Sequence, residues 1–547
     1  MHVRRAGLFR CVDARARGTA TLAALIACAS ATASQNGEWP KPPASVAQAT
    51  ESTPTDEDFL AARPGDWLTY NRSFSADRYS PLDEINIRNA HRLQVACVFQ
   101  PGHIGSFETS PVVFGGRMYV TTAYKTFALD AATCRPLWSH TYTPSGPEHM
   151  IGNRGVALYD GKVFRGTSDA HLLALDAASG KLLWDVHVND SSYGYLISGA
   201  PVAFDGKVFT GEAGADFGIT GHVYAFDADT GRHIWTFDIV PTGDQPGAET
   251  WGGGQAQGGG STWSSMAIDP ERRLLLVPTG NPGPSFNADL RPGDNLFTNS
   301  IVALDLDTGR LDWYVQQVPH DVRDWDTAAT PTLYTIDGWR RVAVASKDGY
   351  LYIYDADTRE TVAKTEIMRH ENHDVPLSYD RPIRVCPGAL GLFNGASHSP
   401  LTRMLFVGTA ERCETIQQDV PHYIKGKTYF GARVQGDPPE QQFGWLRGID
   451  AATGEQRWVL RMDRPMLAGT TPTAGGVLFT GTLDGEFLAI EQTSGRILYR
   501  FQTGGAIAGG VSTYAVDGKQ YVAVASGNSS RGWGTSGSAT IVVFTLP

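Results

Sequence analysis

The segment LLALDAASGKLLW, residues 172–184, decides the fold because the chain repeats its pattern. It combines an apolar strand, an Asp-x-x-Ser-Gly turn and a second strand that ends in tryptophan, which is typical of a β-hairpin. Six other segments carry the same pattern, at residues 127–138, 223–235, 301–313, 351–363, 446–458 and 487–499. Most of them follow another short hairpin, so one repeat predicts four strands.

The spacing of the repeats predicts a β-propeller. The turn aspartates Asp130, Asp176 and Asp227 are 46 and 51 residues apart, which is the length of one four-stranded blade. Two later intervals of 78 and 95 residues must contain insertions in the loops. We expect an all-β, eight-bladed propeller of four-stranded antiparallel blades, in which residues 65–74 and the last strand share the eighth blade. The tryptophans that end the repeats are expected to pack between blades.

Composition and charge narrow the classes of partner. The 547 residues include 61 glycines and 13 tryptophans, which suits a fold with many tight turns and large aromatic anchors. The formal net charge is −11, and no basic run follows residue 18, so the sequence does not predict nucleic-acid binding. Small molecules or proteins are the expected partners.

The N-terminus is typical of an exported protein. A basic start, a short apolar run at residues 22–33 and a small-residue cleavage site ending at Ala33 predict a signal peptide over residues 1–33. An alternative is a lipobox ending at Cys28, which would then carry a lipid anchor. Residues 34–56 are the expected flexible leader, and residues 57–547 the propeller. Because the apolar run is too short to span a bilayer, we expect a periplasmic protein, soluble or lipid-tethered.

Four cysteines remain beyond the export segment, namely Cys97, Cys134, Cys386 and Cys413. An even number in an oxidising compartment predicts disulfides, and four cysteines allow three pairings. The pairs Cys97–Cys134 and Cys386–Cys413 close the shorter loops and are the expected ones, with buried free thiols as the alternative. No C-x-x-C-H motif occurs, so no covalent c-type haem is expected.

The hairpins with the phrase Asp-Ala-x-Thr-Gly-x-x-x-Trp resemble the repeats of quinoprotein alcohol dehydrogenases. These are eight-bladed propellers that hold pyrroloquinoline quinone (PQQ) and a divalent cation on the axis. The resemblance extends from about Asp66 to Pro547. Outer-membrane assembly lipoproteins have similar repeats and bind no quinone, so each site residue must be compared individually.

Several motifs resemble the cofactor-binding stretches of this family. GSFETSPVV implies a contact between Glu108 and the quinone, and NRGVAL implies that Arg154 pairs with a PQQ carboxylate, for which a planar guanidinium is well suited. GGGSTWSSMAIDP resembles the stretch whose tryptophan, here Trp263, lies flat under the quinone, with Ser261 as a hydrogen-bond donor. The resemblance also implies cofactor contacts from Ser198, Lys347 and Asn394.

Oxygen ligands for a cation come from three further stretches. GEAGADFG places Asp216 where relatives usually have Glu, PTGNPG supplies Asn281, and VPHDVRDWDT places Asp324 on the catalytic aspartate of the family. Hard oxygen ligands of this kind suit Ca²⁺. Asp326 stands where lanthanide-using relatives carry an extra aspartate, and another carboxylate favours a cation of higher charge. Ca²⁺ is the expected ion, and a lanthanide is the alternative.

The chain departs from the family at Glu148 and His149. Many alcohol-oxidising relatives have adjacent cysteines there, which form a ring disulfide over the quinone. Their replacement argues against membership of the methanol- and ethanol-oxidising branches, and Glu148 or His149 is a candidate for shaping the substrate mouth.

The resemblance implies a PQQ-dependent dehydrogenase of alcohols or sugar-like polyols. Asp324 would take the hydroxyl proton while hydride passes to PQQ, with the cation as Lewis acid. Electrons would leave to an external cytochrome, cupredoxin or membrane quinone. The alternative is a propeller that binds proteins as an envelope scaffold and holds no quinone. Convergence of the site residues on one axial cavity separates the two hypotheses.

Overall fold

A computed structural model describes residues 53–61, 63–252, 258–392 and 394–547. The chain comprises two units, Met1–Lys41 and Pro42–Pro547, of which only the second contains described residues. The predicted signal peptide and lipobox, and the leader up to residue 52, lie outside the described residues. In the described part of the chain, no helix has the length and apolar character needed to cross a membrane.

Eight sheets of four antiparallel strands form the predicted propeller blades. The first three are β2 (Val112–Phe114), β3 (Arg117–Thr121), β4 (Lys125–Asp130) and β5 (Pro136–Thr141); β6 (Ala157–Tyr159), β7 (Lys162–Gly166), β8 (His171–Asp176) and β9 (Leu182–His187); and β10 (Val202–Phe204), β11 (Lys207–Gly211), β12 (His222–Asp227) and β13 (His233–Asp238). The next two are β14 (Ala267–Asp269), β15 (Leu274–Pro278), β16 (Ser300–Asp305) and β17 (Leu311–Gln316); and β18 (Thr332–Ile336), β19 (Trp339–Ala345), β20 (Tyr350–Asp355) and β21 (Thr361–Glu366). The last three are β23 (Ser397–Ser399), β24 (Met404–Glu411), β27 (Phe443–Asp450) and β28 (Gln456–Met462); β29 (Thr471–Pro472), β30 (Val477–Gly481), β31 (Glu486–Glu491) and β32 (Ile497–Gln502); and β33 (Ile507–Val516), β34 (Lys519–Ser526), β35 (Thr540–Thr545) and β1 (Gln94–Phe99).

The repeated Asp-x-x-Thr/Ser-Gly turn follows from local chemistry. In the second blade, the Asp176 carboxylate accepts hydrogen bonds from the backbone N–H and the hydroxyl of Ser179, at 2.8 and 2.5 Å. Gly180 follows with φ 74°, a left-handed conformation that glycine adopts without strain. Where a repeat lacks glycine, Arg359 takes up a φ of 65° instead. The turn chemistry therefore specifies each hairpin locally.

The tryptophan that ends a repeat packs on the next blade, as the sequence predicts. The Trp138 indole N–H donates to the Ala177 carbonyl at 2.9 Å, and that of Trp235 donates to the Leu306 carbonyl at 3.1 Å. A Cβ on Gly180 would lie 2.5 Å from the Trp138 ring, so the turn glycine also makes room for the tryptophan of the preceding blade. Local hairpins and inter-blade contacts thus use the same motif.

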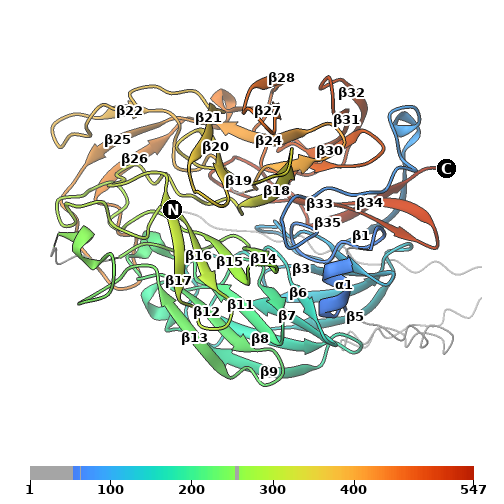
Figure 1. The fold of residues 1–547 in the computed structure, drawn as a ribbon, viewed down its shortest axis with the longest axis horizontal. Helices are drawn as coiled ribbons and strands as arrows, with labels where there is room; N and C mark the ends of the chain where they lie inside the picture. The colour runs from blue at the N-terminus through green and yellow to red at the C-terminus, as the bar shows by residue number, and fades with distance from the viewer. Residues whose placement is uncertain (1–52, 62, 253–257, 393) are drawn as a thin grey trace, which may run out of the picture. The chain divides into compact units, whose positions relative to one another are not determined.

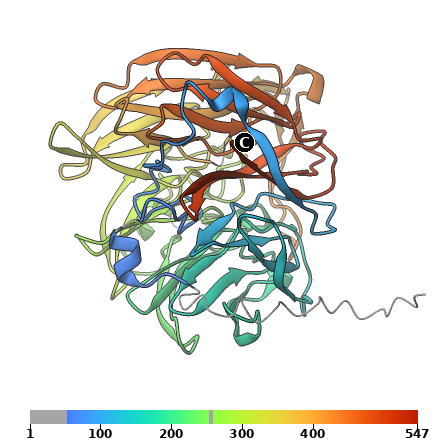
Figure 2. The same ribbon diagram turned by 90° about the vertical axis from the view of Figure 1, so that its right-hand side faces the viewer.

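The propeller closes through an early strand that the sequence prediction missed. β1 pairs with the C-terminal strand β35, so that blue and red segments lie side by side in Figure 1 and again in Figure 2. The prediction that residues 65–74 supply this strand is wrong, because Trp67 instead makes a bridge to Val113 beside β2. The disulfide Cys97–Cys134 is confirmed and ties β1 to the turn that follows β4.

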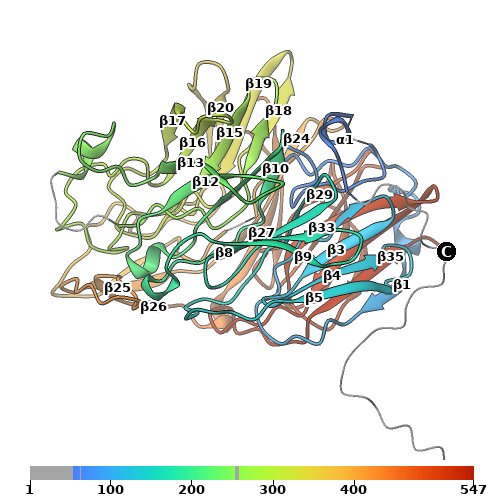
Figure 3. The same ribbon diagram turned by 90° about the horizontal axis from the view of Figure 1, so that it is seen from below.

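Short helices and one extra sheet lie outside the blades. The helices are α1 (Asp56–Ala61) and the 3-10 turns η2 (Ala90–Arg92), η3 (Ser191–Tyr193), η4 (Ala215–Phe217), η5 (Ala248–Trp251) and η6 (Pro439–Gln441). Two insertions, one between β21 and β23 and one between β24 and β27, together form a three-stranded sheet of β22 (Ile383–Val385), β25 (Glu414–Gln418) and β26 (Ala432–Gly436). β25 and β26 extend from the blades in Figure 3. The disulfide Cys386–Cys413, which links the two insertions, is also confirmed.

Residues 53–56, assigned to the leader from the sequence, contact the propeller. Thr53 is buried, and its hydroxyl accepts a hydrogen bond from the backbone N–H of Gly161. The Asp56 carboxylate accepts one from the Tyr159 hydroxyl at 3.0 Å. Residues 53–56 therefore pack against the second blade.

At one end of each antiparallel blade, the loop that precedes the first strand lies beside the loop that follows the second strand. Within a hairpin, the first strand begins beside the point where the second strand ends. Loops that enter a first strand and loops that leave a second strand therefore gather at the same end of each blade. First strands of neighbouring blades contact one another, among them β6 with β10 and β18 with β23. These loops consequently surround the centre of the propeller.

Candidate active site

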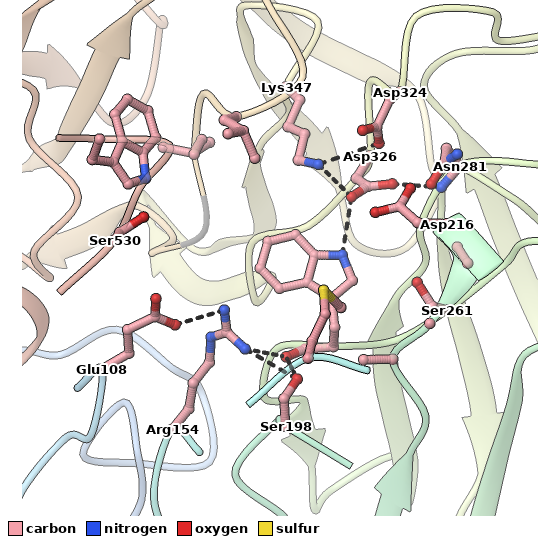
Figure 4. Close-up of a pocket in the computed structure, with 18 residues that line it drawn as sticks. Glu108, Arg154, Ser198, Asp216, Ser261, Asn281, Asp324, Asp326, Lys347 and Ser530 are labelled. Atoms are coloured by element: carbon pink, nitrogen blue, oxygen red, sulfur yellow. Dashed lines mark hydrogen bonds and ion pairs between the residues drawn. The ribbon is translucent and has the colours of Figure 1, made fainter. Parts of the chain in front are cut away.

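One cavity, with a volume of about 320 Å³, is lined by loops of these two kinds. Its walls include almost every residue that the sequence singled out, shown together in Figure 4. These residues are Glu108, Arg154, Ser198, Asp216, Ser261, Trp263, Asn281, Asp324, Asp326 and Lys347. Asn394 does not line the cavity, because its amide is held by protein groups: Nδ2 donates to the carbonyls of Leu467 and Ala508, and Oδ1 accepts from the Tyr70 hydroxyl.

Arg154 forms the centre of one wall. Its Nη2 lies 2.8 Å from a Glu108 carboxylate oxygen, and its Nη1 donates to the Ser198 hydroxyl and to the Trp263 carbonyl, both at 3.1 Å. The backbone N–H of Arg154 also donates to the Ser198 carbonyl at 2.9 Å. The guanidinium is therefore fixed in orientation before any ligand binds, as a planar fork for carboxylates requires.

The Trp263 indole is a fixed platform in the cavity wall. Its Nε1–H donates to Asp326 Oδ2 at 2.9 Å, which sets the rotation of the ring. The Arg154 guanidinium carbon lies 4.9 Å from the ring centroid and the Lys347 ammonium nitrogen 5.2 Å from it. A planar ligand that stacks on this ring would thus have a cation at each side.

Acidic and amide oxygens gather at the opposite end of the cavity, where Figure 4 shows Asp216, Asn281 and Asp324. Asp216 lies in η4 and accepts a hydrogen bond from the Ser285 hydroxyl at 3.2 Å. The Asn281 Nδ2 donates to the Pro282 carbonyl at 3.2 Å, and its Oδ1 accepts no hydrogen bond from the described residues.

Asp326 connects this end to the platform. Its Oδ1 accepts the Asn281 backbone N–H at 2.5 Å, and its Oδ2 accepts from Lys347 Nζ at 2.6 Å in addition to the Trp263 indole. Lys347 Nζ also lies 3.4 Å from Asp324 Oδ1. One ammonium therefore serves two buried carboxylates.

The charges in this end of the cavity are not balanced by protein groups alone. Burial raises the pKa of Asp324 well above its usual value, with Lys347 opposing the shift and Asp326 and Asp216 adding to it. Burial also raises the pKa of Asp216. Burial by itself would lower the pKa of Lys347, but Asp324 and Asp326 raise it. Three carboxylates and an amide oxygen around one ammonium are a donor set that fits a hard cation such as Ca²⁺ or a lanthanide.

Asp321 has a different role from the other two aspartates of its stretch. Its carboxylate does not line the cavity but accepts the backbone N–H groups of Arg323 and Trp325, at 2.8 and 2.9 Å. These bonds form the tight turn in which Asp324 has a φ of 58°, a strained conformation for a residue other than glycine. Asp321 therefore shapes the loop that presents Asp324.

A compact all-carboxylate metal group is absent from the described ranges. The one group of His, Cys, Asp and Glu ligand atoms within 4.8 Å of one another is Glu371, Cys386 and Cys413. Both cysteines are in a disulfide, so this group is not available as a thiolate metal site.

Glu148 and His149, which stand where relatives have the ring disulfide, contact other parts of the protein. Glu148 accepts hydrogen bonds from the Tyr124 and Ser168 hydroxyls, and the His149 ring packs 5.0 Å from the ring of Phe217. Neither residue lines the cavity, whereas Met150, the next residue, does. Met150 is therefore the residue of this stretch that lines the cavity, and a role of Glu148 or His149 at its mouth stays a hypothesis.

Besides Met150 and residues 213–215, four wall residues were not predicted from the sequence, namely Leu390, Leu392, Ser530 and Trp533. Leu390 and Leu392 precede the first strand β23, and Ser530 and Trp533 follow the second strand β34 of the closing blade. The rule that these two kinds of loop meet at one end of the blades would have found all four. Leu390, Leu392 and Trp533 give the cavity an apolar wall.

Comparisons with known proteins agree with this geometry. The family profile described as "Glucose/ethanol/alcohol dehydrogenase, beta-propeller domain", named PQQ, matches residues 67–387. A second profile, "Outer membrane protein assembly factor BamB", matches residues 442–539, which contain the later repeats from β27 to β34.

The chain is similar to quinone-dependent alcohol dehydrogenases over most of its length. It is 34% identical over 575 residues to an "Alcohol dehydrogenase (quinone), dehydrogenase subunit" from Gluconobacter oxydans, covering 90% of this chain and 74% of that protein. It is 31% identical to a "Lanthanide-dependent methanol dehydrogenase" from Methylacidiphilum fumariolicum, covering 86% and 85%. The solved structure of a "Europium-containing methanol dehydrogenase" superposes with a TM-score of 0.81 at 28% identity, covering 90% of this chain and 100% of that one.

Proposed function

The chain belongs to the family of PQQ-dependent alcohol dehydrogenases, and on that basis we propose that it oxidises the hydroxyl of an alcohol, or of a sugar-like polyol, to a carbonyl. We propose further that it works in the periplasm and passes electrons to an external cytochrome, cupredoxin or quinone. The predicted N-terminal export signal and the two disulfides support this location.

One observation carries the proposal: apart from Asn394, the residues expected to hold PQQ and those expected to hold a cation line a single cavity. Arg154 and most of the other cofactor residues come from loops before first strands, as does Asp324, whereas Asp216 and Asn281 come from loops after second strands. A propeller that served only as a scaffold would have no reason to bring these side chains together. The scaffold hypothesis therefore explains the fold but not the cavity.

PQQ, when bound, supplies a quinone that accepts the hydride of the alcohol carbon, and the cation beside it supplies Lewis acidity. The protein would hold PQQ through Arg154 and Glu108, with the Trp263 ring as the platform. Each of these side chains is fixed by protein contacts, so little ordering remains to be done on binding.

Asp324 is the residue that would accept the hydroxyl proton of the alcohol. It lines the cavity at the cation end, and the turn capped by Asp321 holds it in one conformation. Lys347 lies 3.4 Å from its carboxylate and favours the ionised form that a base requires. The same ammonium can stabilise negative charge that develops on a neighbouring oxygen.

Ca²⁺ or a lanthanide ion fits the oxygen donors Asp216, Asn281 and Asp324. Asp326 adds a carboxylate at this end, although three protein donors already bind it. We propose Ca²⁺ as the working ion, and a lanthanide as the alternative because one similar protein is named as lanthanide-dependent.

The experiment is a reconstitution of purified, metal-stripped protein. PQQ is titrated in parallel with Ca²⁺ and with La³⁺, and reduction of an artificial dye is followed with aliphatic alcohols, aromatic alcohols and polyols as substrates. Stoichiometric PQQ binding with cation-dependent dye reduction supports the proposal and identifies the ion. Absence of PQQ binding with either ion would refute it in favour of the scaffold.

A further inference from the structure

Trp325 stands between Asp324 and Asp326 and is anchored outside the cavity. Its side chain is buried, with 4% of its surface exposed. The ring stacks on His373 at a centroid distance of 5.4 Å and lies 5.1 Å from the Arg323 guanidinium carbon. Its indole N–H donates to the carbonyl of Pro387 at 3.0 Å. The position of the aspartate loop therefore depends on where Pro387 is held.

Pro387 directly follows a disulfide-bonded cysteine. Cys386 is linked to Cys413, and both are buried. The chain on either side of the disulfide is paired as well: Gly388 N–H donates to the Arg412 carbonyl at 2.8 Å, and Ala389 N–H donates to a Glu414 carboxylate oxygen at 3.1 Å.

The same segment reaches the cavity by a second route. Leu390 and Leu392, which lie three and five residues after Pro387, form part of the apolar wall. Leu392 is buried, whereas 41% of the Leu390 surface is exposed. One short segment thus contacts the aspartate loop through Trp325 and supplies the wall through its leucines.

We infer that the disulfide Cys386–Cys413, acting through Pro387 and the Trp325 indole, is a brace that positions the loop carrying Asp324 and Asp326. A loop with a strained residue at Asp324 holds that conformation only if its surroundings oppose relaxation. Asp321 opposes relaxation through hydrogen bonds within the loop, and Trp325 opposes it through the hydrogen bond of its indole to Pro387 outside the loop. The inference rests on the proposed function only in so far as the braced loop serves PQQ and a cation.

Two substitutions break the brace at different points. Trp325→Phe removes the indole donor to Pro387 but keeps an aromatic ring between Arg323 and His373. The double substitution Cys386→Ser/Cys413→Ser removes the covalent link and leaves Trp325 unchanged. A third protein combines all of these substitutions.

Matched controls exist elsewhere in the chain. Trp138 is also buried, and its indole N–H also donates to a backbone carbonyl, that of Ala177 at 2.9 Å, so Trp138→Phe makes the same chemical change between two blades. Cys97→Ser/Cys134→Ser removes the other disulfide. Each control is expected to lower thermal stability without affecting the aspartate loop.

Two readouts test the brace. The first is amide hydrogen exchange over residues 321–327 in protein without cofactor or metal, which we expect to become faster in both brace variants and to stay unchanged in both controls. The second is the dissociation constant of PQQ in the presence of Ca²⁺, from quenching of tryptophan fluorescence. It should rise about 10-fold or more in the brace variants, the size of effect seen when supports of metal ligands are lost.

The combined variant decides whether the two elements act as one. If they do, its PQQ dissociation constant matches that of the cysteine variant alone, because the indole bond has already lost its anchor. Unchanged exchange over residues 321–327 in the folded cysteine variant, or fully additive losses of affinity, would overturn the inference. If the parent protein binds no PQQ, the proposed function fails, and the exchange measurement alone then decides the brace.

Discussion

His398 should make the propeller sensitive to acid, and the structure gives the size of the effect. His398 lies on β23, where 5% of its surface is exposed and its ring stacks on Tyr334 at a centroid distance of 4.4 Å. Its Nε2 has no hydrogen-bond partner among the described residues. Burial, assisted by the nearby charge of Arg403, lowers the pKa of His398 from 6.5 to about 4.

The direction of the effect follows from this lowered pKa. His398 binds a proton near pH 6.5 in the unfolded chain and only near pH 4 in the folded chain. The neutral, buried imidazole therefore costs no stability above pH 6.5, and the free energy of unfolding falls as the pH drops from 6.5 to 4. At pH 5 the loss is about 2 kcal/mol, at 1.36 kcal/mol for each pKa unit. Dividing this loss by the unfolding entropy of the propeller unit, about 2.1 cal/mol/K per residue, predicts that Tm falls by about 2 °C.

His398→Phe keeps the stacked ring and cannot bind a proton, so it should remove this loss. Scanning fluorimetry at pH 8 and pH 5 measures the drop in Tm of each protein between the two pH values. This drop should be about 2 °C smaller in the variant than in the parent. The exposed His91, changed to Phe, is the control and should follow the parent. A variant that loses as much Tm as the parent between pH 8 and pH 5 would refute the assignment of His398 as a buried neutral imidazole.

Three substitutions in the cavity test the roles of its charged groups. Arg154→Lys keeps the positive charge, but a single ammonium cannot bind Glu108 and Ser198 together as the planar guanidinium does. The PQQ dissociation constant, measured by fluorescence titration, should therefore rise about 10-fold or more. An unchanged value contradicts the role of the guanidinium. Asp324→Asn should lower kcat/KM in the dye assay by at least about 100-fold while PQQ still binds, and a variant that keeps its activity excludes Asp324 as the base. Asp326→Asn should weaken La³⁺ more than Ca²⁺ in competition titrations, because the lost attraction scales with the charge of the ion, and equal losses would show that Asp326 does not discriminate between them.

The blades could be predicted from the sequence because their information is local. An aspartate that caps the turn, a residue in the left-handed conformation and a tryptophan at the end of the strand all lie within 13 residues of one another, as in residues 172–184. The site residues could be placed because short motifs such as VPHDVRDWDT carry several of them at once. Both disulfides followed from the same preference for short loops.

The closing strand and the inserted sheet could not be predicted in the same way. β1 finds its partner β35 more than 400 positions away in the sequence, and no turn connects the two strands to signal the pairing. β22, β25 and β26 lie between long loops without the repeat motif. Asn394 stays a prediction as a cofactor contact: Leu392, two residues before it, lines the cavity, while the Asn394 amide donates to two backbone carbonyls.

The charge of the cavity links cation binding to cofactor binding. Its ionisable wall residues are four acids and two bases, Glu108, Asp216, Asp324, Asp326, Arg154 and Lys347. Arg154 pairs with Glu108, which leaves Lys347 alone against three carboxylates at the other end. PQQ is itself an anion through its carboxylates, so it would enter a cavity that already has an excess of negative charge. A cation at Asp216 and Asp324 removes that repulsion, and the bound anion in turn raises the affinity for the cation, as linkage requires. Cofactor and metal should therefore bind cooperatively, with each titration curve shifting to lower concentration in the presence of the other.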